Sequence, residues 1–335
     1  PKYRPRDDRV VEVDWEPYDR LVSGWLDGSS FDDRVGLAAW VVPASLAHPD
    51  AALNGGFYSA RYARLMAAYL AECERHFAQR GWQARSIIRP LPPGALESEY
   101  IATATRLAGI VSQARLETRL AVHLPPESPR ALGWSGAPPI ELAGVGVWVP
   151  PASLYEPAVL ERQRRMGHAT WFTPDRPEYS TPLLPTGQSR DAILLAWQAY
   201  RYETGGVWIE HTASTAHGNW PLVHAGVRFG VLDRPVGSLR LKRLRRGQQD
   251  YELLRLLERG GSALLARRTS ERVVRRAFAD AGVENLLSTR GGGWARDART
   301  LRLARQVTLD ELAAAFAPSS ELLARAARSE ADWER

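Results

Sequence analysis

Aromatic side chains near the ends of predicted strands give this chain its clearest chemical character. The sequence contains 12 tryptophans, and the flat face of an indole ring is a good surface for the C–H groups of a sugar. The candidates for such stacking are Trp148, Tyr155, Trp171, Trp208 and Trp220. Because strand side chains alternate between two faces, each of these rings could instead fill a hydrophobic core.

Polar side chains that could bond sugar hydroxyls lie near the same strand ends. They are His123, His211 and Asn219, while His168 precedes its strand and is a weaker candidate. Glu210 ends the segment VWIE and precedes His211, so we expect its carboxylate at the mouth of a pocket. A glutamate in that position either pairs with an arginine or exchanges protons with a substrate.

The cysteine and histidine content favours neither disulfides nor metals. The chain has 1 cysteine, Cys73, so no internal disulfide can form. Cys73 falls in the apolar stripe of a predicted helix, where a cysteine behaves as a small hydrophobic residue. The 7 histidines are scattered, without the spacing of a metal site. We therefore predict no metal and no cofactor.

Short apolar segments alternate with amphipathic segments along most of the chain. The predicted strands are residues 36–42, 86–89, 119–123, 145–149, 169–172 and 207–210. The predicted helices include one that begins near Ser59, then Glu99–Ala114 and Ser189–Glu203. Such alternation implies a parallel sheet, either open or closed into a (β/α) barrel. No Gly-x-Gly-x-x-Gly loop follows any strand, and strand ends rich in Trp, His and Glu favour the barrel.

The segment Ser238–Leu257 is predicted to be a helix with a charged outer face. Leu241, Leu244, Tyr251 and Leu254 recur at helical spacing and form one apolar stripe. Gly247 lies near that stripe, which predicts the close approach of another backbone. Arg246 can pair with Asp250 four residues on, and Glu252 can pair with Arg255 three residues on.

The same segment resembles a family motif, S-x-R-x-x-x-x-R-x-G-x-x-D-Y-E-x-L, through Ser238, Arg240, Arg245, Gly247 and the run from Asp250 to Leu254. The motif is similar to that of glycoside hydrolase family 123-like domains, also catalogued as domain of unknown function 4091. Segments around Trp15–Ser29, His76–Trp82, Trp148–Pro150, Gly167–Thr173 and Ala196–Tyr202 resemble the same family, over roughly Asp14 to Glu258. The resemblance implies a (β/α)8 barrel. It also implies cleavage of terminal β-linked N-acetylgalactosamine by an adjacent Asp-Glu pair, with help from the substrate's acetamido group.

The sequence departs from the family pattern in two ways. Six strand–helix units are visible instead of eight, so we predict a TIM-type barrel that lacks its N-terminal strands. The family's Asp-Glu pair aligns with Pro90 and Leu91, which can neither donate a proton nor stabilise a positive carbon. Glu210, Glu99 and Glu97 are the carboxylates that could replace the pair, although a glutamate in a first helical turn is also an ordinary cap.

Composition and charge set the remaining expectations. The chain has a net charge of +6 that comes mainly from arginine, and no nucleic-acid motif accompanies it, so we predict no nucleic-acid partner. No apolar segment has the length of a membrane span. The expected domains are an arm (residues 1–35), a barrel (36–258) and an Arg-rich helical extension (259–335). The chain begins with Pro1, and a segment missing before it would fit a secreted or extracytoplasmic protein, whereas the oligomeric state is left open.

Three functions remain open from the sequence. The first is a glycoside hydrolase with relocated acids. The second is a degenerate barrel that binds glycans without hydrolysing them, and the third is a structural or interaction domain. In the first case two carboxylates should converge at roughly 5–9 Å in a cleft.

Overall fold

The protein has an α/β fold whose parallel strands follow one another in chain order. The computed structural model describes residues 1–5, 11–45, 48–89, 97–126, 144–181, 183, 188, 190–209, 222–224, 236–280, 293–295 and 297–316. Within these residues the parallel sheet has 6 strands in the order β3-β4-β5-β6-β7-β8. The arrangement agrees with the predicted incomplete TIM-type barrel followed by a helical C-terminal extension.

The chain divides into two compact units. Unit 1 contains the elements from β1 to β6, and unit 2 contains nearly all of those from α4 onward. The strands of unit 1 are β1 (Lys2–Pro5), β2 (Val11–Asp14), β3 (Trp40–Val41), β4 (Ser86–Ile88), β5 (Arg119–Val122) and β6 (Val145–Trp148). Its helices are α1 (Glu16–Leu26), α2 (Ala60–Gln79) and α3 (Glu97–Ala114). The domain boundaries expected at residues 35/36 and 258/259 remain predictions.

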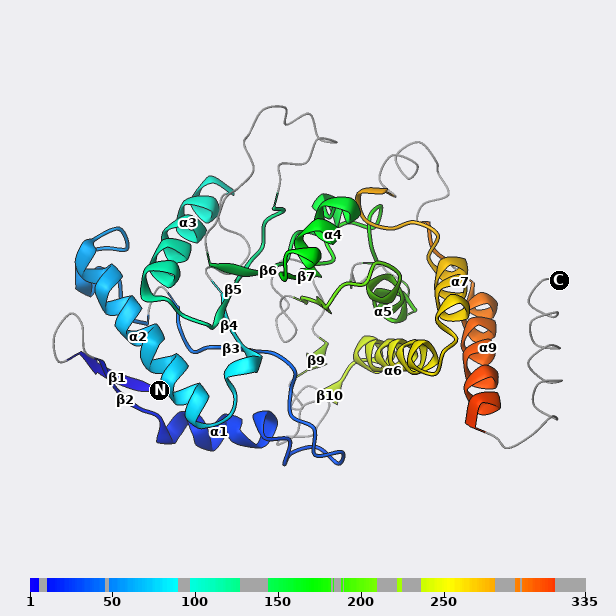
Figure 1. Ribbon diagram of the computed structural model, residues 1–335, viewed down its shortest axis with the longest axis horizontal. Coiled ribbons are helices and arrows are strands. Elements are labelled where there is room, and N and C mark those ends of the chain that lie inside the picture. Colours follow the sequence, from blue (N-terminus) through cyan, green and yellow to red (C-terminus); the bar gives the residue numbers. More distant parts are fainter. Residues whose placement is uncertain are drawn as a thin grey trace. The chain divides into compact units, whose positions relative to one another are not determined.

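Helix α2 is the largest contribution of unit 1 to the hydrophobic core, and it packs beside α3 (Figure 1). Ser59 caps its first turn, because the Ser59 hydroxyl accepts a hydrogen bond of 3.0 Å from the backbone N–H of Tyr62. The whole predicted stripe is buried, namely Tyr62, Leu65, Met66, Tyr69, Cys73 and Phe77. Burial also raises the pKa of the Cys73 thiol to about 12, so the thiol stays protonated.

Two elements of unit 1 were not expected from the sequence. The N-terminal residues, predicted to be an extended arm, form an antiparallel hairpin of β1 and β2. Helix α1 follows, with Pro17 in its first turn, where the fixed φ of proline suits a helix. The first barrel strand is also shorter than residues 36–42. At Gly36 an added Cβ would collide with the carbonyl oxygen of Leu26, so the chain there packs against the end of α1.

Unit 2 combines two parallel strands with a helical layer. Its strands are β7 (Ala169–Phe172, shared at its first residue with unit 1), β8 (Gly206–Val207), β9 (Val223–His224) and β10 (Val236–Gly237). Its helices are α4 (Pro157–Arg165), α5 (Asp191–Arg201), α6 (Leu239–Arg259), α7 (Ala263–Val273) and α9 (Ala298–Phe316). Helices α5, α6, α7 and α9 contact one another (Figure 1). No described helix is both long and apolar enough to cross a membrane.

The family-like motif on α6 is explained by the packing of that helix. Ser238 is the N-cap and accepts a hydrogen bond of 3.2 Å from the N–H of Leu241. Gly247 faces α5, where an added Cβ would lie 2.7 Å from the Ile193 carbonyl oxygen, so the predicted close approach is confirmed. Of the predicted apolar stripe, Leu254 is buried and the other three residues are half-buried.

A buried carboxylate, Asp250, joins α6 to two other helices of unit 2. Asp250 is 5% exposed and accepts a hydrogen bond of 3.2 Å from the Trp197 indole of α5. Arg305 of α9 also binds it, and Arg246 lies 3.7 Å away as predicted. Arg255 pairs with Glu258 rather than with Glu252. Asp250 of α6 therefore contacts both α5 and α9, although burial raises the pKa of its carboxyl and so disfavours its charged form.

Candidate functional site

The described strand ends of unit 1 carry cationic and neutral polar groups. Arg89 directly follows β4, and His123 directly follows β5. The backbone N–H of His123 donates a hydrogen bond of 2.8 Å to the hydroxyl of Tyr100 on α3. Burial, reinforced by the positive charge of Arg89, lowers the pKa of His123 to about 3. The imidazole is therefore neutral near pH 7, where it can bond a hydroxyl but cannot serve as a protonated acid.

Trp148 ends β6 but is nearly covered by protein. Its side chain is 3% exposed, and the indole Nε1 donates to Nδ1 of His168 at 3.4 Å. His168 directly precedes β7, as predicted. Trp148 and His168, two of the predicted sugar-binding residues, thus contact each other in unit 1, with the indole buried and the imidazole half-buried.

Tyr155 of unit 2 also belongs to the interior. Its side chain is 0% exposed and packs against Phe172 on β7 and Phe278, with 4.4 Å between the ring centroids of Tyr155 and Phe278. Burial raises the pKa of its hydroxyl, which receives a hydrogen bond of 3.4 Å from Arg164. Both faces of this ring are occupied by protein in the structure, so it offers no surface to a ligand.

Trp171 and Trp208 form a partly exposed aromatic pair in unit 2. Their ring centroids are 6.2 Å apart and their planes differ by 19°, which is an offset stack. Trp171 lies on the opposite side of β7 from Phe172, because consecutive strand residues alternate. Gly206 allows this placement, since an added Cβ would lie 3.0 Å from the Trp171 ring. The pair is thus separate from the core formed by Phe172, Tyr155 and Phe278.

The predicted catalytic acids are not placed by the structure. Glu210, His211, Asn219 and Trp220 lie outside the described residues. Glu97 and Glu99 belong to the first turn of α3, but the described part of the chain does not include their side chains. Pro90 and Leu91 are likewise outside it. Among the described residues that directly follow β3, β4, β5 and β6 there is no carboxylate.

One strand-end carboxylate of unit 2, Asp175, was not identified from the sequence. Asp175 lies three residues after β7, is half-buried and accepts a hydrogen bond of 3.1 Å from the Ser153 N–H. The Ser153 hydroxyl also donates to it. The signal that could have found it is the run Thr173-Pro174-Asp175, which ends a buried strand with an acid. Within the described residues no group of three or more His, Cys, Asp and Glu side chains could hold a metal ion.

Comparisons with known proteins support the fold. No protein-family model and no curated protein matches the sequence. A family 123 glycoside hydrolase from Clostridium perfringens, studied for glycolipid glycan hydrolysis, is similar over 94% of this chain, with a TM-score of 0.53 and 12% identity. The chain spans 57% of the length of that structure. A putative glycerophosphoryl diester phosphodiesterase from Silicibacter pomeroyi is 17% identical over 56% of this chain and 52% of that one, but its TM-score of 0.30 carries no argument.

The similar hydrolase belongs to the family that the sequence motifs resemble. At 12% identity the likeness concerns the fold, and membership in the family remains a prediction. The chain thus has a glycoside hydrolase-like fold.

Proposed function

We propose that this protein binds glycans through a surface that includes Trp171 and Trp208 of unit 2. The observation that supports the proposal is the stacked, partly exposed ring pair on the side of β7 that faces away from the aromatic core. In barrel enzymes, ligand sites lie at the carboxyl ends of the strands. Trp171 is near the end of β7, and Trp208 directly follows β8.

Sugar rings suit this pair for a physical reason. The axial C–H groups of a hexose form an apolar face, which gains free energy when it covers an indole and displaces water. The predicted groups His211, Asn219 and Trp220, which follow Trp208 in the sequence, would add hydrogen bonds and stacking. Neither a cofactor nor a metal is part of the proposal.

Hydrolysis is the second candidate function, and Asp175 favours it. Cleavage of a glycosidic bond needs a proton donor and a second carboxylate that stabilises or traps the developing positive carbon. Asp175 is one strand-end carboxylate held in place by Ser153. Glu210, which directly follows the VWI segment, is the proposed second.

Binding is tested by titrating neutral oligosaccharides, including an N-acetylgalactosamine-terminated one, while tryptophan fluorescence or heat is recorded. We expect Trp208→Ala to weaken binding roughly tenfold or more, since covering an aromatic side chain contributes about 1.5–3 kcal/mol. The matched control is Trp25→Ala, because Trp25 is 46% exposed and lies on α1 in unit 1. Equal affinity of both variants and the parent chain would overturn the proposed surface.

Hydrolysis is tested on the same proteins with chromogenic β-glycosides, again including the N-acetylgalactosaminide. Turnover that Glu210→Gln or Asp175→Asn removes, with glycan binding retained, would establish an enzyme with relocated acids. Binding without any turnover would establish a non-catalytic glycan-binding protein. Neither binding nor turnover in a folded chain would favour the structural or interaction role.

A further inference from the structure

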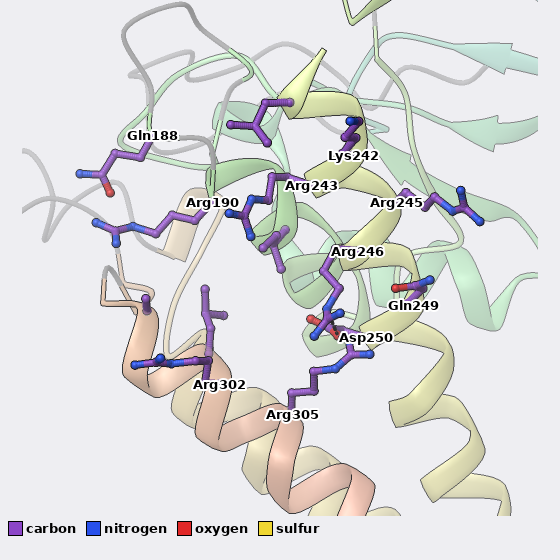
Figure 2. A pocket seen from close by; sticks show the side chains of 14 residues that line it. Gln188, Arg190, Lys242, Arg243, Arg245, Arg246, Gln249, Asp250, Arg302 and Arg305 are labelled. Carbon is purple, nitrogen blue, oxygen red and sulfur yellow. Dashed lines mark hydrogen bonds and ion pairs between the residues drawn. The ribbon is translucent and has the colours of Figure 1, made fainter. Parts of the chain in front are cut away.

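A groove of about 1010 Å³ lies in unit 2 between the beginning of α5, the first half of α6 and the first half of α9 (Figure 2). Its lining includes Gln188, Arg190 and Ile193 at the start of α5, and Leu301, Arg302 and Arg305 on α9. Helix α6 provides the side between them. We call this the basic groove because of the charges described next.

Cations dominate the basic groove. Seven of the lining residues carry a positive charge, namely Arg190, Lys242, Arg243, Arg245, Arg246, Arg302 and Arg305. The only carboxylate in the described lining is Asp250. Figure 2 shows that Asp250 lies beside Arg246 and Arg305, and both are within ion-pair distance of it. Asp250 therefore already pairs with Arg246 and Arg305. No other carboxylate of the described lining neutralises the remaining cations of the groove.

Three of these guanidinium groups are available to a ligand. In the part of the chain that the structure describes, Arg190, Arg243 and Arg302 make no ion pair, and the buried Nε of Arg190 has no hydrogen-bond partner. Arg243 and Arg302 are exposed, and they project from α6 and α9 on either side of the groove. Cations that share a groove repel one another, and a bound anion would remove that repulsion.

The kinds of side chain in the groove narrow the ligand chemistry. A guanidinium group presents a planar fork of N–H donors that matches sulfate, phosphate and carboxylate oxygens. Gln188 and Gln249 add amides that can bond hydroxyls. No aromatic residue is part of the described lining, so neither a neutral sugar ring nor a nucleobase finds a stacking surface there. This combination suits a flexible, hydroxyl-rich polyanion better than single-stranded nucleic acid.

The position of the groove connects it with the proposed glycan surface. A helix of a β/α unit begins near the carboxyl end of the strand before it. The groove includes Gln188 and Arg190, which precede α5, and α5 is the helix that follows β7, the strand on which Trp171 lies. The amino ends of α5, α6 and α9 add positive potential at the same place.

We propose that the basic groove binds the acidic groups of an anionic oligosaccharide, carrying sulfate or uronate groups, so that the glycan ligand of this protein is acidic. This inference rests on the glycan-binding function proposed above, and it adds that the bound glycan is acidic. Arg190, Arg243 and Arg302 are the groups that contact the oxyanions.

The test uses the full chain and measures binding by calorimetry at about 0.15 M salt, where exposed charges are screened beyond roughly 8 Å. The probes are a heparin-derived octasaccharide with sulfates and carboxylates, an oligogalacturonate with carboxylates alone, a neutral N-acetylglucosamine oligomer and a single-stranded RNA octamer. We expect the acidic oligosaccharides to bind more tightly than the RNA and more tightly than the neutral oligomer. A preference for heparin would identify sulfate as the group recognised, and equal binding of the galacturonate would identify carboxylate.

A matched pair of double variants locates the binding. Arg243→Gln with Arg302→Gln removes two groove cations and should weaken acidic-oligosaccharide binding at least about tenfold, as expected for lost charged hydrogen bonds. Arg259→Gln with Arg299→Gln makes the same charge change on α6 and α9 at exposed positions outside the groove, and should weaken it less than about twofold. Because all four side chains are exposed, both double variants should have the same melting temperature as the parent chain.

Three results would overturn the proposal: equal weakening in both double variants, tighter binding of RNA than of either acidic oligosaccharide, or no binding of the acidic oligosaccharides. The Trp208→Ala variant separates this proposal from the proposed function. Acidic-oligosaccharide binding that survives Trp208→Ala, in a chain that does not bind neutral glycans, would support the groove and contradict the aromatic surface.

Discussion

Helices α2 and α6 are of similar length and begin with the same kind of cap, yet they differ in the side chains that they bury. Each follows a serine whose hydroxyl accepts a hydrogen bond from the backbone N–H three residues on. Helix α2 buries a continuous face of aromatic and aliphatic residues in unit 1. Helix α6 buries only Gly247, Asp250, Leu254 and Leu257 in unit 2 and leaves a row of cations exposed. Helix α2 thus covers its apolar face in the core of unit 1, whereas α6 leaves cations uncovered.

The comparison also shows that the sequence motif on α6 overlaps the basic groove only in part, because Arg245 and Asp250 are motif residues that line it. The motif residues Ser238, Gly247, Asp250 and Leu254 cap α6 or pack it against its neighbours. The cations Lys242 and Arg243, which face the basic groove, are not part of the motif. Capping and packing explain the residue types of the first set, whereas Lys242 and Arg243 are exposed.

The largest expected effect is on the core face of α2. Phe77 is 0% exposed and contacts the rings of Trp15, Tyr18 and Trp82. Phe77→Ala should lower the free energy of unfolding by about 3–5 kcal/mol, because it leaves a cavity among aromatic rings. Leu256→Ala on α6, at a position 45% exposed, should change it by less than about 0.5 kcal/mol. Urea denaturation measures both, and a comparable loss for Leu256→Ala would show that the outer face of α6 is covered in solution.

A medium effect is expected where α6 meets α5. Gly247→Ala places a methyl group 2.7 Å from the Ile193 carbonyl oxygen, so the helices must separate, and we expect a loss of about 1–3 kcal/mol. The control is Gly109→Ala in α3, where nothing lies within 4 Å of the added Cβ. That change should stabilise the protein by up to about 1 kcal/mol, since alanine is the better helix former. Thermal melts of the two variants should shift in opposite directions, and a shift in the same direction would contradict the close α5–α6 contact.

The smallest effects concern the two caps. Ser59→Ala and Ser238→Ala should each reduce the free energy of unfolding by about 0.5–2 kcal/mol, because a backbone N–H loses its acceptor. The loss should be greater at Ser59, whose hydroxyl also donates a hydrogen bond of 2.9 Å to the Asn54 carbonyl oxygen. Replacement by aspartate, which also accepts at an N-cap, should restore most of the stability at Ser238. Failure of Ser238→Asp to do so would show that Ser238 has a role beyond capping.

Much of the fold could be predicted from local patterns. The apolar stripe of α2, the strand at Ala169–Phe172 and the close contact at Gly247 follow from periodicity and from the steric needs of single residues. Helix α1 and the hairpin of β1 and β2 were missed. The residues around Trp15 suggested a family motif more strongly than a helix, and the hairpin depends on pairing between segments that are each too short to form alone.

The candidate site could be predicted only in part. The sequence singled out Trp171 and Trp208 but could not distinguish them from Tyr155, because all three are aromatic residues near strand ends. Phe278 covers Tyr155 from a segment more than a hundred residues further along the chain. Burial of that kind depends on long-range packing, which no local pattern encodes.

The sequence by itself determined the alternation of strands and helices, the buried side of α2 and the residues that α6 needs for packing, because periodicity and steric fit act over a few residues. Only the tertiary structure decided that Ser153 holds Asp175, and that Arg190, Arg243 and Arg302 share one groove. These groups come from separate elements, and their charges act on one another only after the hydrophobic packing of the helices has brought them together.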